Sequence, residues 1–100
     1  MKKENLQGVF SPVITPFNRD FTVDHKKLAK QCEWLISQEV GLAVFGTNSE
    51  ANSLSVDEKI FLLDKVIDYG IDPGKLMPGT GCCSLTDTIN LTKHAVKVGC

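Results

Sequence analysis

The chain has 100 residues, of which 42% are hydrophobic and 23% charged, and its 11 basic and 12 acidic side chains leave a formal net charge of −1. This balance is typical of a globular protein and makes neither nucleic acid nor an anionic membrane an expected partner. No window approaches the roughly 18 consecutive apolar residues of a membrane span, and the first seven residues are not the apolar core of a signal peptide. We therefore expect a cytoplasmic protein.

Four cysteines are present, and none is spaced as a C-x-x-C pair. Cys82 and Cys83 are adjacent, which makes it difficult for both to bind one tetrahedral metal ion. The helical signals along the chain are too frequent for a small secreted domain held by disulfides. We expect reduced thiols, no metal site, and Cys32 packed on a helix face.

The first predicted unit is a strand over residues 8–17 followed by a helix. Pro12 and Pro16 lack the backbone N–H that a ladder requires, so this strand is expected to be irregular or to lie at an edge. Asp24 is a good N-cap for the helix, which Gly41 is expected to end. Apolar residues recur along one face of this helix, at Leu28, Cys32, Leu35 and Ile36.

The second predicted unit begins with a continuously apolar strand over residues 42–45, as expected for a strand covered on both faces. A small polar loop over residues 46–50 follows. The next helix begins at Ser55, which has Glu58 at the capping-box spacing, and ends near Gly70. Its predicted apolar face carries Ile60, Leu63, Val66 and Ile67.

The third predicted unit starts after a turn at residues 72–74 with a short strand over residues 76–78. Residues 79–81 read Gly-Thr-Gly, which we interpret as a tight turn because a single G-x-G is weak evidence for a phosphate cradle. Ser84 and Asp87 resemble a capping box for a third helix. The apolar residues expected on that helix are Ile89, Leu91, Ala95 and Val96.

Three successive strand–helix units predict an α/β fold with a parallel sheet. Three such units do not form a closed sheet, because a sheet of three parallel strands leaves two long edges unpaired and covers its helices poorly. We therefore interpret residues 1–100 as part of a larger domain. A barrel and an open, doubly wound flavodoxin-like sheet both fit this pattern.

Candidate site residues follow from the place where the second strand ends. Ligands bind at the C-terminal ends of parallel strands in both of these folds. Thr47 and Asn48 follow the second strand and offer a hydroxyl, an amide and backbone N–H groups to a small anion. The competing interpretation is that Thr47 only satisfies local backbone groups. His25 and His94 are expected at solvated surface positions, and Trp34 in packing.

Several short motifs, in this order, resemble the dihydrodipicolinate synthase and N-acetylneuraminate lyase family. They occupy residues 15–17 with 23–24, 46–50, 54–55 with 58–59, 78–81 and 91–95. The resemblance covers nearly everything from Gly8 onward. It implies a (β/α)8 TIM barrel, of which this chain supplies the first three βα units.

In that family a pair of hydroxyl residues after the second strand holds the carboxylate of pyruvate or another 2-oxo acid. By resemblance, Thr47 and Asn48 inherit this duty, and the Asn48 amide can donate hydrogen bonds as a hydroxyl does. Ser49 replaces the usual glycine, a residue often required at positive φ, so we expect a loop of different shape. Glu50 is expected to bond loop backbone, since a carboxylate facing the pocket would repel the substrate.

The activity that the resemblance implies is that of a class I aldolase-type lyase or synthase, in which a lysine forms a Schiff base with the 2-oxo acid. The family carries this lysine and a proton-relay tyrosine in later segments, so we expect no catalytic residue here. The lysines of the predicted βα units lie on helices or before a strand, away from the site, so they are unsuited to form the Schiff base. These are Lys59, Lys65, Lys75, Lys93 and Lys97.

The resemblance also bears on cofactors and partners. No metal or organic cofactor is implied, because the iminium itself is the electron sink, and family members are commonly homotetramers. The alternative hypothesis is a non-catalytic member or fragment that retains a carboxylate-binding pocket without the chemistry.

Overall fold

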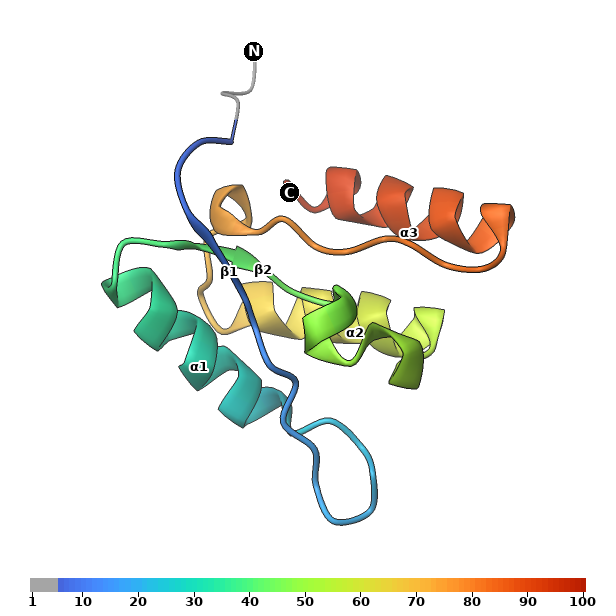
Figure 1. The fold of residues 1–100 in the computed structure, drawn as a ribbon, viewed down its shortest axis with the longest axis horizontal. Coiled ribbons are helices and arrows are strands. Elements are labelled where there is room, and N and C mark those ends of the chain that lie inside the picture. The colour runs from blue at the N-terminus through green and yellow to red at the C-terminus, as the bar shows by residue number, and fades with distance from the viewer. Residues whose placement is uncertain (1–5) are drawn as a thin grey trace.

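The computed structural model describes residues 6–100, so most of the polar segment at the start of the chain lies outside the described part. Strands alternate with helices in the first two units, and an extended segment precedes the last helix (Figure 1). The elements are β1 (Phe10–Pro12), α1 (His25–Ser37), β2 (Gly41–Ala43), α2 (Val56–Asp68) and α3 (Leu85–Lys97). Short 3₁₀ turns occupy Thr47–Ser49, Ala51–Ser53 and Pro73–Lys75. The predicted succession of three βα units is confirmed.

The strands form a parallel ladder in chain order. β1 pairs with β2 in parallel, with Phe10 opposite Gly41. On the other side of β2, residues 76–79 run parallel to it, because Met77 N–H donates to the Leu42 carbonyl at 2.8 Å and Gly79 N–H to the Val44 carbonyl at 2.7 Å. The predicted third strand is therefore present as a hydrogen-bonded extended segment.

The first strand is shorter than the predicted range 8–17. Its regular part ends at Pro12, and one further ladder bond, from Val13 N–H to the Ala43 carbonyl at 3.0 Å, extends the pairing. The chain then leaves the sheet for a loop closed by a bridge between Phe17 and Val23. The irregularity expected from the two prolines is confirmed.

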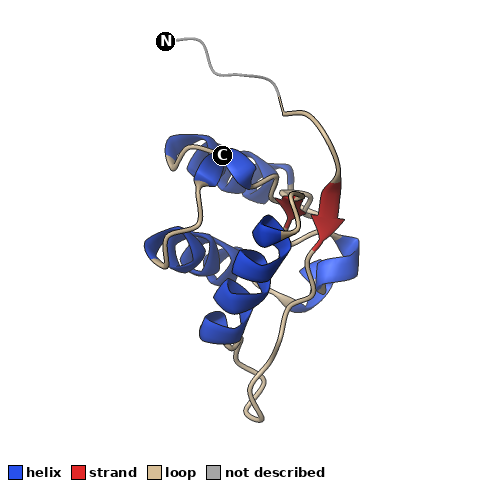
Figure 2. Ribbon diagram, turned by 90° about the vertical axis from the view of Figure 1, so that its left-hand side faces the viewer, coloured by secondary structure: helices blue, strands red, loops and turns tan. Residues whose placement is uncertain are grey.

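The core lies between the strands and the inner faces of the helices. Figure 2 shows most of the helical ribbon on one side of the two strands. The most deeply buried members of this cluster are Val13, Leu28, Cys32, Leu42, Val44, Leu63, Val66 and Leu76. Cys32 packs on the buried face of α1 as predicted, and Cys32, Cys82 and Cys83 are free thiols. Within residues 6–100, no helix has the length and apolar character to cross a membrane.

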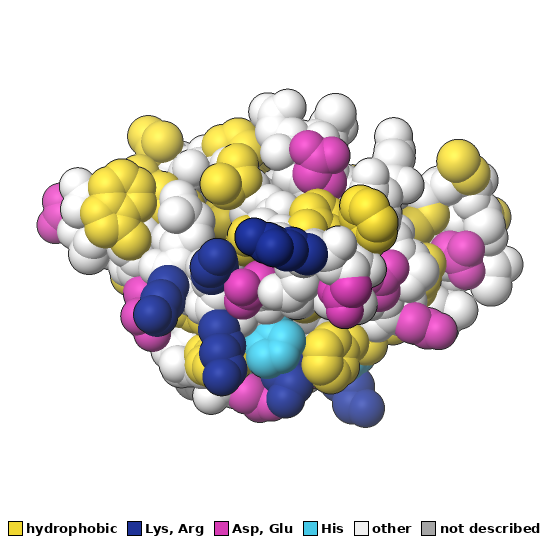
Figure 3. All heavy atoms as spheres, turned by 90° about the horizontal axis from the view of Figure 1, so that it is seen from below, with side chains coloured by type: hydrophobic (Ala, Val, Ile, Leu, Met, Phe, Trp, Pro, Cys, Tyr) yellow, Lys and Arg dark blue, Asp and Glu magenta, His cyan; other side chains and the backbone are white. Residues whose placement is uncertain are grey.

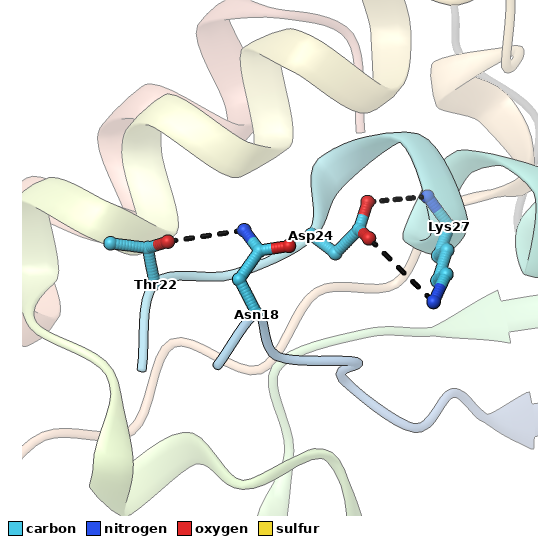
Figure 4. A network of polar contacts seen from close by, with 4 residues as sticks. All are labelled: Asn18, Thr22, Asp24 and Lys27. Carbon is cyan, nitrogen blue, oxygen red and sulfur yellow. Dashed lines mark hydrogen bonds and ion pairs between the residues drawn. The ribbon is translucent and has the colours of Figure 1, made fainter. Parts of the chain in front are cut away.

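The start of α1 is as predicted, whereas its end is not. The Asp24 carboxylate accepts the Lys27 N–H at 3.1 Å and lies 4.0 Å from its ammonium group (Figure 4). The helix ends at Ser37, and the left-handed residue after it is Glu39, with φ of 63°. Gly41 instead begins β2, where a Cβ atom would lie 2.4 Å from the Phe10 ring. The glycine is required for this close approach, so the prediction that it ends the helix is wrong.

The caps of α2 and α3 follow the sequence pattern closely. Ser55 and Glu58 form a complete capping box, with bonds of 3.1 and 3.0 Å, and Gly70 takes φ of 104° after the helix. Ser84 accepts the Asp87 N–H at 3.3 Å, but Asp87 returns no bond. Only half of the predicted second capping box is formed, because aspartate is one methylene shorter than glutamate.

Some predicted packing positions are wrong. On α3, Leu91 is buried, but Ile89 and Val96 are 43% and 67% exposed, and Trp34 on α1 is 58% exposed. Residues 79–81 form no tight turn; they continue the extended segment from the third strand. Gly79 is needed there because a Cβ atom would lie 2.5 Å from the Phe45 carbonyl oxygen.

Gly41 and Glu39, at the α1–β2 junction, allow a paired test of the roles assigned to them. We expect Gly41→Ala to lower the free energy of unfolding by about 1–3 kcal/mol, because the added methyl group overpacks against Phe10. Glu39→Gly should raise it by up to about 1 kcal/mol, because glycine adopts the left-handed conformation at no steric cost. Urea denaturation measures both, and a neutral Gly41→Ala variant would contradict the packing argument.

Candidate functional site

The chain leaves β2 through two buried residues, Val44 and Phe45, and then forms the 3₁₀ turn Thr47–Ser49. This turn lies beyond the C-terminal end of β2 (Figure 1). Thr47 and Asn48 are both exposed there, as expected for residues that follow a strand end. The structure therefore brings the two predicted site residues together.

Thr47 and Asn48 carry hydrogen-bonding groups that the fold does not use. The turn is closed by two bonds to the Gly46 carbonyl, from Ser49 N–H at 3.0 Å and from Ala51 N–H at 3.2 Å. With the described residues, neither the Thr47 hydroxyl nor the Asn48 amide forms a hydrogen bond, and their backbone N–H groups donate to none of them. Several donors thus remain exposed at one edge of the sheet.

Ser49 holds the turn in place from below. It is completely buried, and its carbonyl accepts a hydrogen bond of 2.5 Å from the Thr15 hydroxyl at the end of the β1 segment. The Ser49 hydroxyl in turn donates to the Ala43 carbonyl at 3.4 Å. Sequence reasoning missed Thr15 as a site residue. The available signal was its position, a hydroxyl at the end of a strand that runs parallel to β2.

The backbone of the loop is left-handed at Phe45 and Glu50, with φ of 60° and 64°, and Ser49 does not have positive φ. Ser49 therefore pays no steric penalty, and the expected difference in loop shape from the family stays a prediction. The Glu50 carboxylate makes no hydrogen bond to the part of the chain described, and only its backbone shapes the loop, by accepting Ser53 N–H at 2.9 Å. Its expected carboxylate–backbone bond is absent.

Both histidines contact a second helix. They are partly buried, so they are not the solvated surface positions that were predicted. His25 Nδ1 lies 2.9 Å from the Tyr69 hydroxyl, and its ring centroid is 6.1 Å from that of Phe61 on α2. His94 Nε2 lies 2.7 Å from Asp64 Oδ1, which links α3 to α2. Figure 3 shows a histidine side chain between basic and apolar side chains on the face seen from below.

The lysines lie where the sequence pattern placed them, on helices or, for Lys75, in the 3₁₀ turn before the third strand. Lys59 is unusual, because only 4% of its surface is exposed. It lines a hollow between α2 and α3 that includes neither Thr47 nor Asn48. Within residues 6–100, no three or more His, Cys, Asp or Glu side chains gather closely enough to hold a metal ion.

Comparison with known proteins gives a consistent result. The model of the dihydrodipicolinate synthetase family matches residues 5–100. A 4-hydroxy-tetrahydrodipicolinate synthase from Desulforamulus reducens is 36% identical over 100% of this chain and 34% of that protein. The chain thus spans about a third of the length of this relative.

Solved structures agree with the sequence match. A dihydrodipicolinate synthase from Agrobacterium tumefaciens superimposes with a TM-score of 0.88 and 27% identity, over 92% of this chain and 32% of that one. The enzyme from Acinetobacter baumannii, complexed with pyruvate, superimposes with a TM-score of 0.79 and 33% identity, over 95% of this chain and 33% of that one. The (β/α)8 fold class is confirmed for the portion present.

The bond that fastens the loop can be tested directly. We expect Thr15→Val to lower the free energy of unfolding by about 1–2 kcal/mol, because the buried Ser49 carbonyl loses its donor. Thr15→Ser keeps the hydroxyl and should recover most of this loss. Urea denaturation of the three proteins measures the difference, and equal stability of all three would show that the bond does not hold the loop.

Proposed function

We propose that this chain, which belongs to the dihydrodipicolinate synthetase family, supplies the carboxylate-binding loop of a Schiff-base-forming lyase or synthase. The proposed substrate is pyruvate or a related 2-oxo acid. The observation that carries the proposal is the set of unused donors on Thr47 and Asn48 at the C-terminal end of β2. Because the chain spans about a third of the length of this relative, we propose that residues 1–100 are part of one barrel domain.

The loop has the chemistry that a carboxylate requires. Each carboxylate oxygen accepts hydrogen bonds, and bonds to an ionised acceptor are about twice as strong as those between neutral groups. Thr47 offers a hydroxyl and Asn48 an NH₂ group, and both residues are exposed. Buried Phe45 and Ser49 fix the turn beneath them, so the donors are positioned before the substrate arrives.

Schiff-base chemistry needs an amine in addition to the hydrogen bonds that hold the substrate carboxylate. A lysine must be deprotonated to attack the substrate ketone, and burial or a neighbouring cation supplies this by lowering its pKa. The iminium then withdraws electrons from the carbon–carbon bond being made or broken, so no metal or organic cofactor is needed. We propose that this lysine and the proton-relay tyrosine belong to later segments of a cytoplasmic homo-oligomer.

Trapping of the imine tests the proposed chemistry. The full-length protein is incubated with pyruvate and borohydride, and its intact mass is compared with that of samples lacking either reagent. We expect one covalent adduct per chain, formed only when both reagents are present. No adduct with pyruvate or with longer 2-oxo acids would favour the non-catalytic alternative.

The role of Thr47 is tested by kinetics. We expect Thr47→Val to raise KM for the 2-oxo acid about tenfold, because one hydrogen bond to a charged group is worth about 1.5 kcal/mol. Thr92→Val, at an exposed position on α3, is the matched control and should leave KM unchanged. An unchanged KM in Thr47→Val would remove this residue from the site.

A further inference from the structure

Two adjacent cysteines open on one hollow, away from the loop that carries Thr47. Cys83 is exposed and Cys82 is half-buried, and both line a hollow of about 610 Å³ between the first turns of α2 and α3. Neighbouring side chains of an extended strand point to opposite faces. Here the chain bends at residues 83–84, immediately before α3, which allows both thiols to reach the same space.

The backbone on each side of the cysteine pair is fixed. The Thr88 hydroxyl oxygen accepts the Cys82 N–H at 3.1 Å and lies 3.4 Å from the Cys82 carbonyl oxygen, to which it donates. On the other side, Ser84 caps α3 through its bond with Asp87 N–H. Both attachments tie the pair to the first turn of a 13-residue helix. The backbone that carries both thiols is therefore fixed before any ligand binds.

We propose that Cys82 and Cys83 form a vicinal dithiol site for soft, thiophilic electrophiles that take two sulfur ligands at one centre, with trivalent arsenicals as the ligand class. Sulfur is the softest ligand atom that a protein offers, and the trivalent arsenic centre takes only two sulfur ligands from the protein, whereas a structural tetrahedral metal site takes four ligands. With an organoarsenous oxide, two As–S bonds form and the arsenic–oxygen bond breaks. The oxygen leaves as water with the two thiol protons, so no oxidant or reductant is needed.

The charges around the hollow suit a reaction with a neutral ligand. Lys59 lines it together with two carboxylates, Asp57 and Asp87, so no single charge sign dominates. Because the arsenous oxide is neutral and water is the only leaving group, neither a strong positive nor a strong negative field is required. A charged ligand would gain less from this mixed lining.

The other two cysteines provide internal controls. Cys32 is fully buried in the core, and burial raises the pKa of its thiol to about 12, which keeps it protonated and unreactive. Cys100 has no cysteine adjacent to it in the described chain. A single thiol can give only one As–S bond, and such an adduct is displaced by excess monothiol.

The test uses the folded full-length protein with phenylarsine oxide, a chase with excess glutathione, and mass spectrometry of the peptide that carries Cys82 and Cys83. We expect one adduct on this peptide that resists glutathione and is removed by 2,3-dimercaptopropanol. Cys82→Ser and Cys83→Ser should each abolish the resistant adduct, whereas Cys32→Ser and Cys100→Ser should retain it. Absence of the adduct in the unaltered protein, or its persistence in either of the first two variants, would overturn the proposal.

A further variant tests whether the fold organises the pair. Thr88→Val keeps both thiols but removes the hydroxyl that binds the Cys82 backbone. We therefore expect glutathione to remove the adduct at least fivefold faster from this variant than from the unaltered protein. An unchanged rate would show that sequence adjacency alone explains binding and would overturn the organised site. The outcome is independent of Schiff-base activity, which the imine-trapping experiment tests separately.

Discussion

The hydrogen bond from the Thr15 hydroxyl to the Ser49 carbonyl connects the two strand ends on which the candidate site depends. The parallel ladder between β1 and β2 brings these ends to the same edge of the sheet. The bond then fixes the turn after β2, and Ser49 is completely buried beneath it. Because the turn is held from below, its upper donors on Thr47 and Asn48 do not have to serve the fold. In this turn, Ser49 therefore serves the fold, while Thr47 and Asn48 serve the proposed function.

The ladder also supports the proposal that these units are part of a larger domain. β1 is hydrogen-bonded to β2 on one side, and around it Val9 and Ile14 are 71% and 62% exposed within the described chain. An open strand edge with apolar neighbours is costly in water, and a closed barrel removes it. Further strands of the proposed barrel would cover this surface and complete the pocket above Thr47.

Much of the fold could be predicted from the sequence, because local patterns determine it. The capping box of Ser55 with Glu58 and the N-cap Asp24 fix helix starts by contacts within four residues, and these predictions are confirmed. The errors concern contacts between distant segments. Gly41 is needed for the Phe10 ring, thirty-one residues away, and nothing near it in the sequence reveals that. The exposed Val96 shows that periodicity identifies an apolar face without showing what covers it.

The candidate site shows the same division between local and distant information. Thr47 and Asn48 could be selected because they follow an apolar strand, a local signal, and their role in binding stays a prediction. Thr15 could not be selected, because its partner is 34 residues away and is a backbone carbonyl, which no side-chain pattern marks. The shape of the loop also escaped prediction, because its left-handed residues are Phe45 and Glu50 and neither is a glycine.

Binding of the substrate carboxylate by Thr47 and Asn48 can be tested with a crystal structure of the full-length protein reduced with borohydride in the presence of pyruvate. We expect the carboxylate of the trapped substrate to lie within hydrogen-bond distance of the Thr47 hydroxyl or N–H and of Asn48. We also expect that Thr15 still donates to Ser49. A carboxylate bound elsewhere, with Thr47 and Asn48 facing solvent, would contradict this expectation.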